Sequence, residues 1–414
     1  MSLSNPWFAL ALVGVLLLFH IELFATLLNL ARFSRPLPER LRAIYDKDKL
    51  ANTAEYAGAS ARVEVIRDAF FLGVLIAFWW LGGFGWLHHK MAAFGWGEVW
   101  TGVATLAALT LAQTVLSLPF QWWDTFGVEA QFGFNRTTPA TFIGDQIKSL
   151  FLMALLGLPV TALVIWFFAT QPWAAVYAWV SVALFSIAMT WAAPRFIMPL
   201  FLKFKPLEEG PLRQAILAMA DRLKFPVKDV SVVDGSRRSS KANAFFAGFG
   251  KNKRIALYDT LIEGHTQEEL LAVLAHEIGH QKRGHVPVHL VVGLLEMGLL
   301  FGLLHLGLKS QGMFDAFGVE GRPIGMGMML FSILYRPLST LLSVLTSAIS
   351  RRHEFQADAY ASEAVKGPQP LMDALMKLSA DHLSHPMPHP FYVGLHYSHP
   401  PLEQRLSALE SAKS

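Results

Sequence analysis

The sequence predicts a mainly α-helical membrane protein that has seven transmembrane helices and a small α+β domain. Hydrophobic residues make up 53% of the 414 residues and charged residues only 16%, against about 25% in a typical soluble chain. The mean hydropathy is +0.38. Several stretches reach the roughly 20 apolar residues that cross a hydrocarbon core, and one charged segment separates two groups of these stretches.

The predicted spans follow one another in two groups, five before the charged segment and two after it. The first span is too long for a signal peptide and follows no positive charge, so we expect it to stay in the protein. Lys and Arg mark the cytoplasmic side, and they gather in residues 31–64. The amino terminus is therefore predicted outside, with residues 194–285 and the C-terminal tail inside. The spans lie near 7–30, 65–87, 99–120, 149–169, 173–193, 286–308 and 324–349.

Charge and cysteine content exclude several classes of function. The net charge is +4, but an excess of Lys and Arg in a membrane protein belongs to its cytoplasmic loops. We therefore expect membrane lipid around the chain and no nucleic-acid partner. The chain has no cysteine, which excludes a disulfide framework, a cysteine-ligated metal and a thiol nucleophile.

Charged residues cluster between Lys203 and Gly284 and predict an extramembrane insertion. We divide the chain into a membrane domain, 1–193, with five spans, and a second domain, 194–414, that includes the last two spans and the tail. Residues 229–234 and 254–258 have the composition of strands, and residues 244–250 lead into the second strand.

A helix is predicted to begin after Thr266 and to run to about Gly284. Thr266 and Glu269 have the spacing of a capping box, in which each side chain bonds the other residue's backbone N–H.

This helix contains His276-Glu277-Ile278-Gly279-His280, an H-E-x-x-H motif. Residues four apart share one helix face, so both imidazoles can bind one metal ion. Glu277 is placed to act as general base on an attacking water. Zinc suits such a site because it activates water near neutral pH and polarises a carbonyl. A chance pair of surface histidines is the alternative that so short a motif leaves open.

A catalytic zinc needs a third protein ligand. Val286 stands where a metzincin has its third histidine, and His285, one residue earlier, is predicted to be a helix-end residue. If residues 350–358 are helical, Glu354 and Asp358 share a face. Glu354 can then complete the site while Asp358 holds a liganding imidazole. From spacing alone, two ordinary acidic residues on a solvated helix remain the alternative.

Taken together, the motifs resemble those of the type I CAAX prenyl proteases, which are integral-membrane zinc metallopeptidases. The resemblance covers nearly the whole chain, and its motifs occur in the family's order. They are the seven spans, residues 132–136, 194–201, 241–248 and 258–261, the H-E-x-x-H helix, His353-Glu354-Phe355-Gln356-Ala357-Asp358, and the late segment 398–405.

The resemblance implies spans that enclose a water-filled chamber, one zinc ion per chain at its cytoplasmic-side wall, and Glu354 as third ligand. It also implies removal of the C-terminal tripeptide from prenylated C-a-a-X proteins. By matching motif, His399 and Arg405 approach the scissile carbonyl and its oxyanion. Asn243 lies on the segment that binds the substrate backbone, and we expect an extended peptide to pair with the strand edge formed by Ala244, Phe245 and the residues that follow.

Two further functions stay open from the sequence. A quality-control protease would use the same chemistry on unprenylated membrane proteins, although such enzymes usually have fewer spans. A transporter with a structural zinc is disfavoured because structural sites are closed by four ligands, typically including cysteine. No endoplasmic-reticulum retrieval signal is evident, so we expect a bacterial plasma membrane rather than the endoplasmic reticulum.

Ionisable residues inside spans are expected to line the chamber or to pair between helices: His20, Glu22, Glu296, His305 and Arg336.

Overall fold

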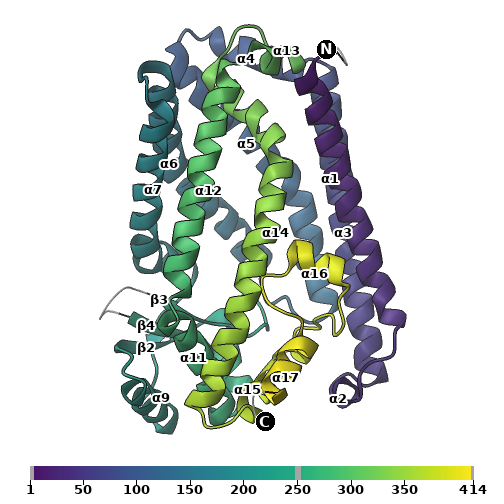
Figure 1. The fold of residues 1–414 in the computed structure, drawn as a ribbon, viewed down its shortest axis with the longest axis vertical. Coiled ribbons are helices and arrows are strands. Elements are labelled where there is room, and N and C mark those ends of the chain that lie inside the picture. The colour runs from purple at the N-terminus through teal and green to yellow at the C-terminus, as the bar shows by residue number, and fades with distance from the viewer. Residues whose placement is uncertain (1–3, 248–252, 412–414) are drawn as a thin grey trace.

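A computed structural model describes residues 4–247 and 253–411 of the chain. Long helices run along its long axis, and a small sheet with several shorter helices lies at one end (Figure 1). The long helices are α1 (Pro6–Ala31), α3 (Lys47–Trp80), α5 (Gly97–Trp122), α6 (Pro139–Thr170), α7 (Ala174–Ala192), α12 (His285–Lys309) and α14 (Ile324–Ala364). Short helical elements join or follow them: η1 (Arg32–Ser34), α2 (Glu39–Arg42), α4 (Gly83–Ala92), η2 (Trp123–Glu129), η3 (Ala193–Ile197), α8 (Met198–Phe201) and α13 (Gln311–Ala316). A further short helix, η4 (Gly235–Arg237), lies between two strands of the sheet.

The helices confirm the prediction of a multi-span membrane protein. Within the described residues, six helices are long and apolar enough to cross a membrane, and α3 with α4 makes a seventh if the bent pair is one span. Large apolar side chains point outward from α1, where Leu10, Leu17 and Phe24 are each more than half exposed. Lipid is the solvent that such a surface needs.

The second span differs from its predicted bounds of 65–87. The helix breaks after Trp80, and α4 leaves at 67° to α3. Gly82 takes a left-handed backbone with φ of 73°, which a residue with a side chain rarely adopts. Gly85 then packs so closely on the Gly318 carbonyl that an added Cβ would lie 2.4 Å from its oxygen.

The last span is also longer than predicted. We expected it to end at 349, but α14 is one helix of 41 residues, about 61 Å long at 1.5 Å per residue. It packs against α5 through Gly325 and Gly102 and against α1 at Gly14. The predicted helix over residues 350–358 is therefore part of the C-terminal end of a membrane helix.

A four-stranded sheet confirms the predicted strands and lies beside the motif helices. Its strands are β1 (Phe204–Pro206), β2 (Val227–Val233), β3 (Ala244–Ala247) and β4 (Lys253–Tyr258), in the order β1-β2-β4-β3. β2 and β4 are parallel, whereas β3 pairs antiparallel with β4. β3 is thus an edge strand. Residues 248–250 of the predicted edge segment lie outside the described residues.

Helices cover this sheet and bury its apolar side chains. α9 (Pro211–Arg222), α10 (Asp259–Gly264) and α11 (Gln267–Lys282) contact its strands. α15 (Gln369–Asp381) packs on α11 and α14, α17 (Leu402–Ser411) packs on α14 and α15, and α16 (Pro390–His396) lies against α1 and α14. One buried hydrophobic cluster contains Ile255 and Leu257 of β4 and Leu270 and Leu274 of α11. The predicted capping box is present at the start of α11. This packing fixes α11, and with it the H-E-x-x-H motif, against the sheet.

Two of the ionisable residues inside the spans line one cavity between α1, α3 and α14. Glu22 and Arg336 face it together with Glu64 and Asp68 of α3. Glu22 forms an ion pair of 3.0 Å with His396 of α16. The predicted pairing of Glu22 or Glu296 with Arg336 is not among the ion pairs of the described residues, where Glu296 instead accepts a hydrogen bond from a threonine of α14.

Candidate metal centre and substrate cleft

Two helices bring the predicted zinc ligands together. His276 and His280 lie one turn apart on α11, and Glu354 comes from α14. Gly279 allows the two helices to approach closely, because an added Cβ would lie 3.2 Å from the Ala357 Cα. The glycine inside the motif therefore serves packing, while the histidines on either side of it point at the facing helix.

The three ligand side chains converge on one point. Their nitrogen and oxygen atoms lie within 4.8 Å of one another, and the two histidine Nε2 atoms are 3.2 Å apart. Glu354 is 3% exposed, and its Oε2 is buried without a hydrogen-bond partner among the described residues. An orphaned carboxylate oxygen between two imidazoles fits a zinc ion, and three protein ligands leave the open position of a catalytic site.

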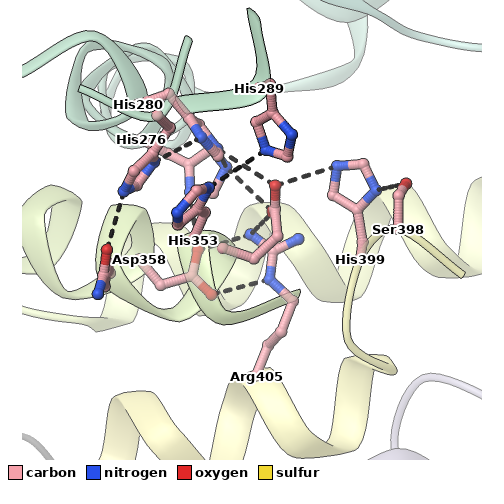
Figure 2. A network of polar contacts seen from close by, with 11 residues as sticks. His276, His280, His289, His353, Asp358, Ser398, His399 and Arg405 are labelled. Atoms are coloured by element: carbon pink, nitrogen blue, oxygen red, sulfur yellow. Dashed lines mark hydrogen bonds and ion pairs between the residues drawn. The ribbon is translucent and has the colours of Figure 1, made fainter. Parts of the chain in front are cut away.

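Asp358 and Arg405 support the ligands from behind. Asp358 Oδ1 lies 2.8 Å from His276 Nδ1, which agrees with the contact predicted for it. Arg405 of α17 donates two hydrogen bonds to the same carboxylate, at 2.8 and 2.6 Å. Both side chains are buried. Figure 2 shows the guanidinium turned toward Asp358, so the geometry places Arg405 behind the ligands.

Glu277 lies next to the first ligand and faces a cleft of about 560 Å³. Burial raises the pKa of its carboxyl group above the usual range. A carboxylate with a raised pKa takes up and returns a proton closer to neutral pH, as a general base must.

The cleft also brings together most of the predicted substrate-binding residues. Asn243 and Ala244 line it, as do His399 and Arg405. The Asn243 carbonyl accepts the Tyr258 N–H, which joins the start of β3 to β4. Phe245 is not brought to the cleft, because its ring packs near Phe204 and Tyr258.

His399 is the predicted residue that is best placed to meet a substrate. Its side chain is 62% exposed, and its Nε2 lies 3.3 Å from a Glu354 oxygen. Its Nδ1 is 2.9 Å from the Ser398 hydroxyl, and Figure 2 shows the ring between Ser398 and the ligand cluster.

Sequence reasoning missed several residues that hold the site. His382 accepts the Ala242 N–H through Nε2 at 2.9 Å, directly before β3. Lys241 donates to the Tyr56 hydroxyl and to Glu129, at 2.9 and 3.0 Å. These contacts tie the start of the edge strand to α3 and η2. They span more than 100 residues, so no local pattern could have indicated them.

Comparison with known proteins gives the same assignment as the site. A family model described as the CAAX prenyl protease N-terminal, five membrane helices, matches residues 26–203, and one described as Peptidase family M48 matches residues 206–413. The CAAX prenyl protease 1 homolog of Oryza sativa is 37% identical over all of this chain and 99% of its own length. The CAAX prenyl protease 1 of Saccharomyces cerevisiae is 34% identical over 90% of this chain and 88% of its own.

A solved structure shows that the similarity extends to the whole fold. The crystal structure of S. mikatae Ste24p superposes with a TM-score of 0.92 and 33% identity, covering 98% of this chain and 99% of that one. The fold and the three-residue zinc site agree with the sequence matches over both halves of the chain. The chain therefore belongs to the CAAX prenyl protease 1 family of M48 zinc metallopeptidases.

Proposed function

We propose that this enzyme hydrolyses a peptide bond near the C-terminus of prenylated C-a-a-X proteins. One observation carries the proposal. The cleft lined by Glu277 and the ligand His276 is also lined by Asn243 and Ala244, where the edge strand β3 begins. A backbone-binding edge beside a hydrolytic centre suits an extended, unstructured chain end. The names of the relatives supply the substrate class.

In the proposed mechanism, His276, His280 and Glu354 would hold a zinc ion, which would polarise the scissile carbonyl as a Lewis acid and lower the pKa of water. Glu277 takes a proton from the attacking water and returns it to the leaving amine. His399 donates an N–H to the carbonyl oxygen where negative charge develops, a contribution of about 10²–10³ in rate. Arg405 keeps Asp358 ionised behind His276 and adds positive charge to the same side of the cleft.

We infer that the substrate binds by adding a strand to β3. Main-chain hydrogen bonds then give affinity with little dependence on side-chain identity, and Asn243 anchors a neighbouring peptide group. Because proline lacks the N–H that such pairing needs, a proline scan upstream of the cleavage site should abolish cleavage at alternate positions. Uniform tolerance of proline would show that the peptide binds elsewhere.

Paired peptides test the substrate class. Purified protein in detergent is incubated with a farnesylated C-a-a-X peptide and with its unmodified counterpart, and the products are identified by mass spectrometry. We expect faster cleavage of the farnesylated peptide and none by Glu277→Gln, which keeps the shape of the side chain. Equal cleavage of both peptides would instead favour the quality-control protease.

We also propose that the catalytic end faces the cytoplasm, as the Lys and Arg of residues 31–64 indicate. The natural chain has no cysteine, so single-cysteine variants label cleanly. Lys251, which the sequence places in the predicted cytoplasmic domain, lies outside the described residues, so we choose Glu268, an exposed residue of α11. Glu268→Cys should label only after permeabilisation, whereas Glu320→Cys, in the exposed loop before α14, should label from outside intact cells.

We further propose that the chain divides into two domains between residues 193 and 194, that membrane lipid surrounds its spans, and that this membrane is a bacterial plasma membrane. The relatives named above come from a plant and a fungus, and they give the bacterial location no support.

A further inference from the structure

Both liganding histidines have a partner for the ring nitrogen that faces away from the metal position. The partner of His276 is Asp358. The partner of His280 is another histidine, because His285 Nδ1 lies 3.0 Å from His280 Nδ1. His285 is the first residue of α12, follows the left-handed turn at Gly284 and is 2% exposed. The helix-end residue predicted from the sequence is thus buried against a zinc ligand.

The hydrogen bonds of His285 determine which of its nitrogens carries the proton. Its Nε2 lies 2.9 Å from the Gln356 side-chain oxygen, and an amide oxygen can only accept. The proton of a neutral His285 is therefore on Nε2, and Nδ1 has a free lone pair. That lone pair accepts the Nδ1–H of His280, which leaves the His280 Nε2 lone pair directed at the metal position.

The same assignment follows from the metal end. Zinc binds the lone pair of a neutral imidazole, and His280 Nε2 is the nitrogen that lies beside His276 Nε2 and Glu354. His280 must then carry its proton on Nδ1, so His285 Nδ1 accepts this hydrogen bond and the Gln356 oxygen accepts a second one from the His285 Nε2–H. The argument from Gln356 and the argument from the metal position therefore give the same arrangement of protons.

Packing keeps the His285 ring in the orientation that this arrangement needs. His353 of α14 stacks on it with 4.0 Å between ring centroids and 3° between ring planes. Figure 2 shows His353 and His280 in one group of rings.

We propose that His285 and Gln356 are positioning residues that fix the tautomer and the ring orientation of the zinc ligand His280. This role goes beyond the proposed substrate, because it concerns the affinity of the site for metal. Contacts behind a metal ligand typically change metal affinity 10–100-fold when they are lost. Gln356 lies two residues after Glu354, so α14 supplies a ligand and, through His285, the orientation of a second ligand.

Zinc affinity of the purified full-length protein, measured by competition with a chromogenic chelator, tests the proposal. Gln356 is exposed, so its substitution leaves the core intact. Gln356→Met keeps the length of the side chain and removes the acceptor, whereas Gln356→Glu keeps an acceptor oxygen. We expect Gln356→Met to weaken zinc binding about 10–100-fold and Gln356→Glu to stay within about threefold of the natural protein.

A second pair of variants tests His285 itself. His285→Ala should lose affinity like Gln356→Met, and His285→Asn should recover most of it because its side-chain oxygen can take the place of the Nδ1 acceptor. Val288→Ala is the matched control, since Val288 lies less than one turn further along α12 and its side chain is 42% exposed.

The melting temperature of the metal-free protein separates positioning from general stability. We expect it to be the same for Gln356→Met and Gln356→Glu, while their zinc affinities differ. Equal zinc affinities for these two variants, or a loss in Val288→Ala as large as that in Gln356→Met, would overturn the proposal.

Discussion

Replacing Arg405 by methionine is expected to destabilise the protein through the charge that it leaves behind. Arg405 is 8% exposed and Asp358 1% exposed, and two hydrogen bonds join them. Removal of one partner of such a buried pair costs about 3–5 kcal/mol of unfolding free energy, because the Asp358 charge then stays buried with only the His276 imidazole beside it. With an unfolding entropy of about 2.1 cal/mol/K per residue, the melting temperature of the 414-residue chain falls by roughly 3–6 °C.

A double-mutant cycle isolates the contribution of the pair. Asp358→Asn keeps an acceptor for His276 but leaves the guanidinium unpaired, so it should cost about as much as Arg405→Met. The double variant buries neither charge, and we expect it to recover about 2–3 kcal/mol relative to additive losses. Thermal unfolding in detergent, followed by tryptophan fluorescence, gives all four values for metal-free protein.

Activity measurements then distinguish the two roles of Arg405. If it acts mainly by holding Asp358, Arg405→Met loses stability and zinc affinity together with activity. A variant that kept its melting temperature and its zinc but lost kcat would refute this reasoning and would make Arg405 a direct oxyanion donor. Arg405→Lys keeps the charge without the two-pronged geometry and should show an intermediate loss.

Three further predictions concern residues away from the ligands. Burial lowers the pKa of His385 to about 4 from 6.5, so between these pH values the unfolded chain binds more protons than the folded one. The melting temperature should therefore fall as pH drops from 6.5 toward 4, and His385→Asn should reduce that fall. Lys241→Met should raise KM about tenfold with a smaller change in kcat, because the segment before β3 loses its hydrogen bond to Glu129. Gly325→Ala should cost about 1–3 kcal/mol, since its Cβ would lie 2.3 Å from the facing glycine of α5, whereas Gly293→Ala, which meets no atom within 4 Å, should not destabilise α12.

Local physics made the first part of the zinc site predictable. The capping box of Thr266 and Glu269 and the i, i+4 spacing of His276 and His280 depend on residues within one or two helical turns, and the structure contains both. Glu354 needed the family resemblance as well, because spacing alone could not show that its helix faces α11.

Apart from the contact between Asp358 and His276, the contacts behind the ligands could not be predicted in this way. Asp358 and Arg405 are 47 residues apart, and His285 and Gln356 are 71 apart. Such pairs depend on how helices pack in three dimensions, which the hydrophobic pattern of each helix leaves open. His285 did have a sequence signal, because it is a histidine five residues after the second ligand. Its spacing differs by one residue from that of a metzincin's third ligand, and it indicated no other role.

The continuity of α14 links the membrane to the zinc site. Gly325, where α14 meets α5, and Glu354 are 29 residues apart on one helix, or about 44 Å, so a tilt of only about 1.5° at one end moves the other by roughly 1 Å. An added Cβ at Gly14 would lie 2.9 Å from the Pro337 ring, so α1 holds α14 in place near the proline that could otherwise act as a hinge. Accurate placement of Glu354 therefore depends on close packing inside the membrane. For this reason the spans belong to the catalytic apparatus as well as anchoring it.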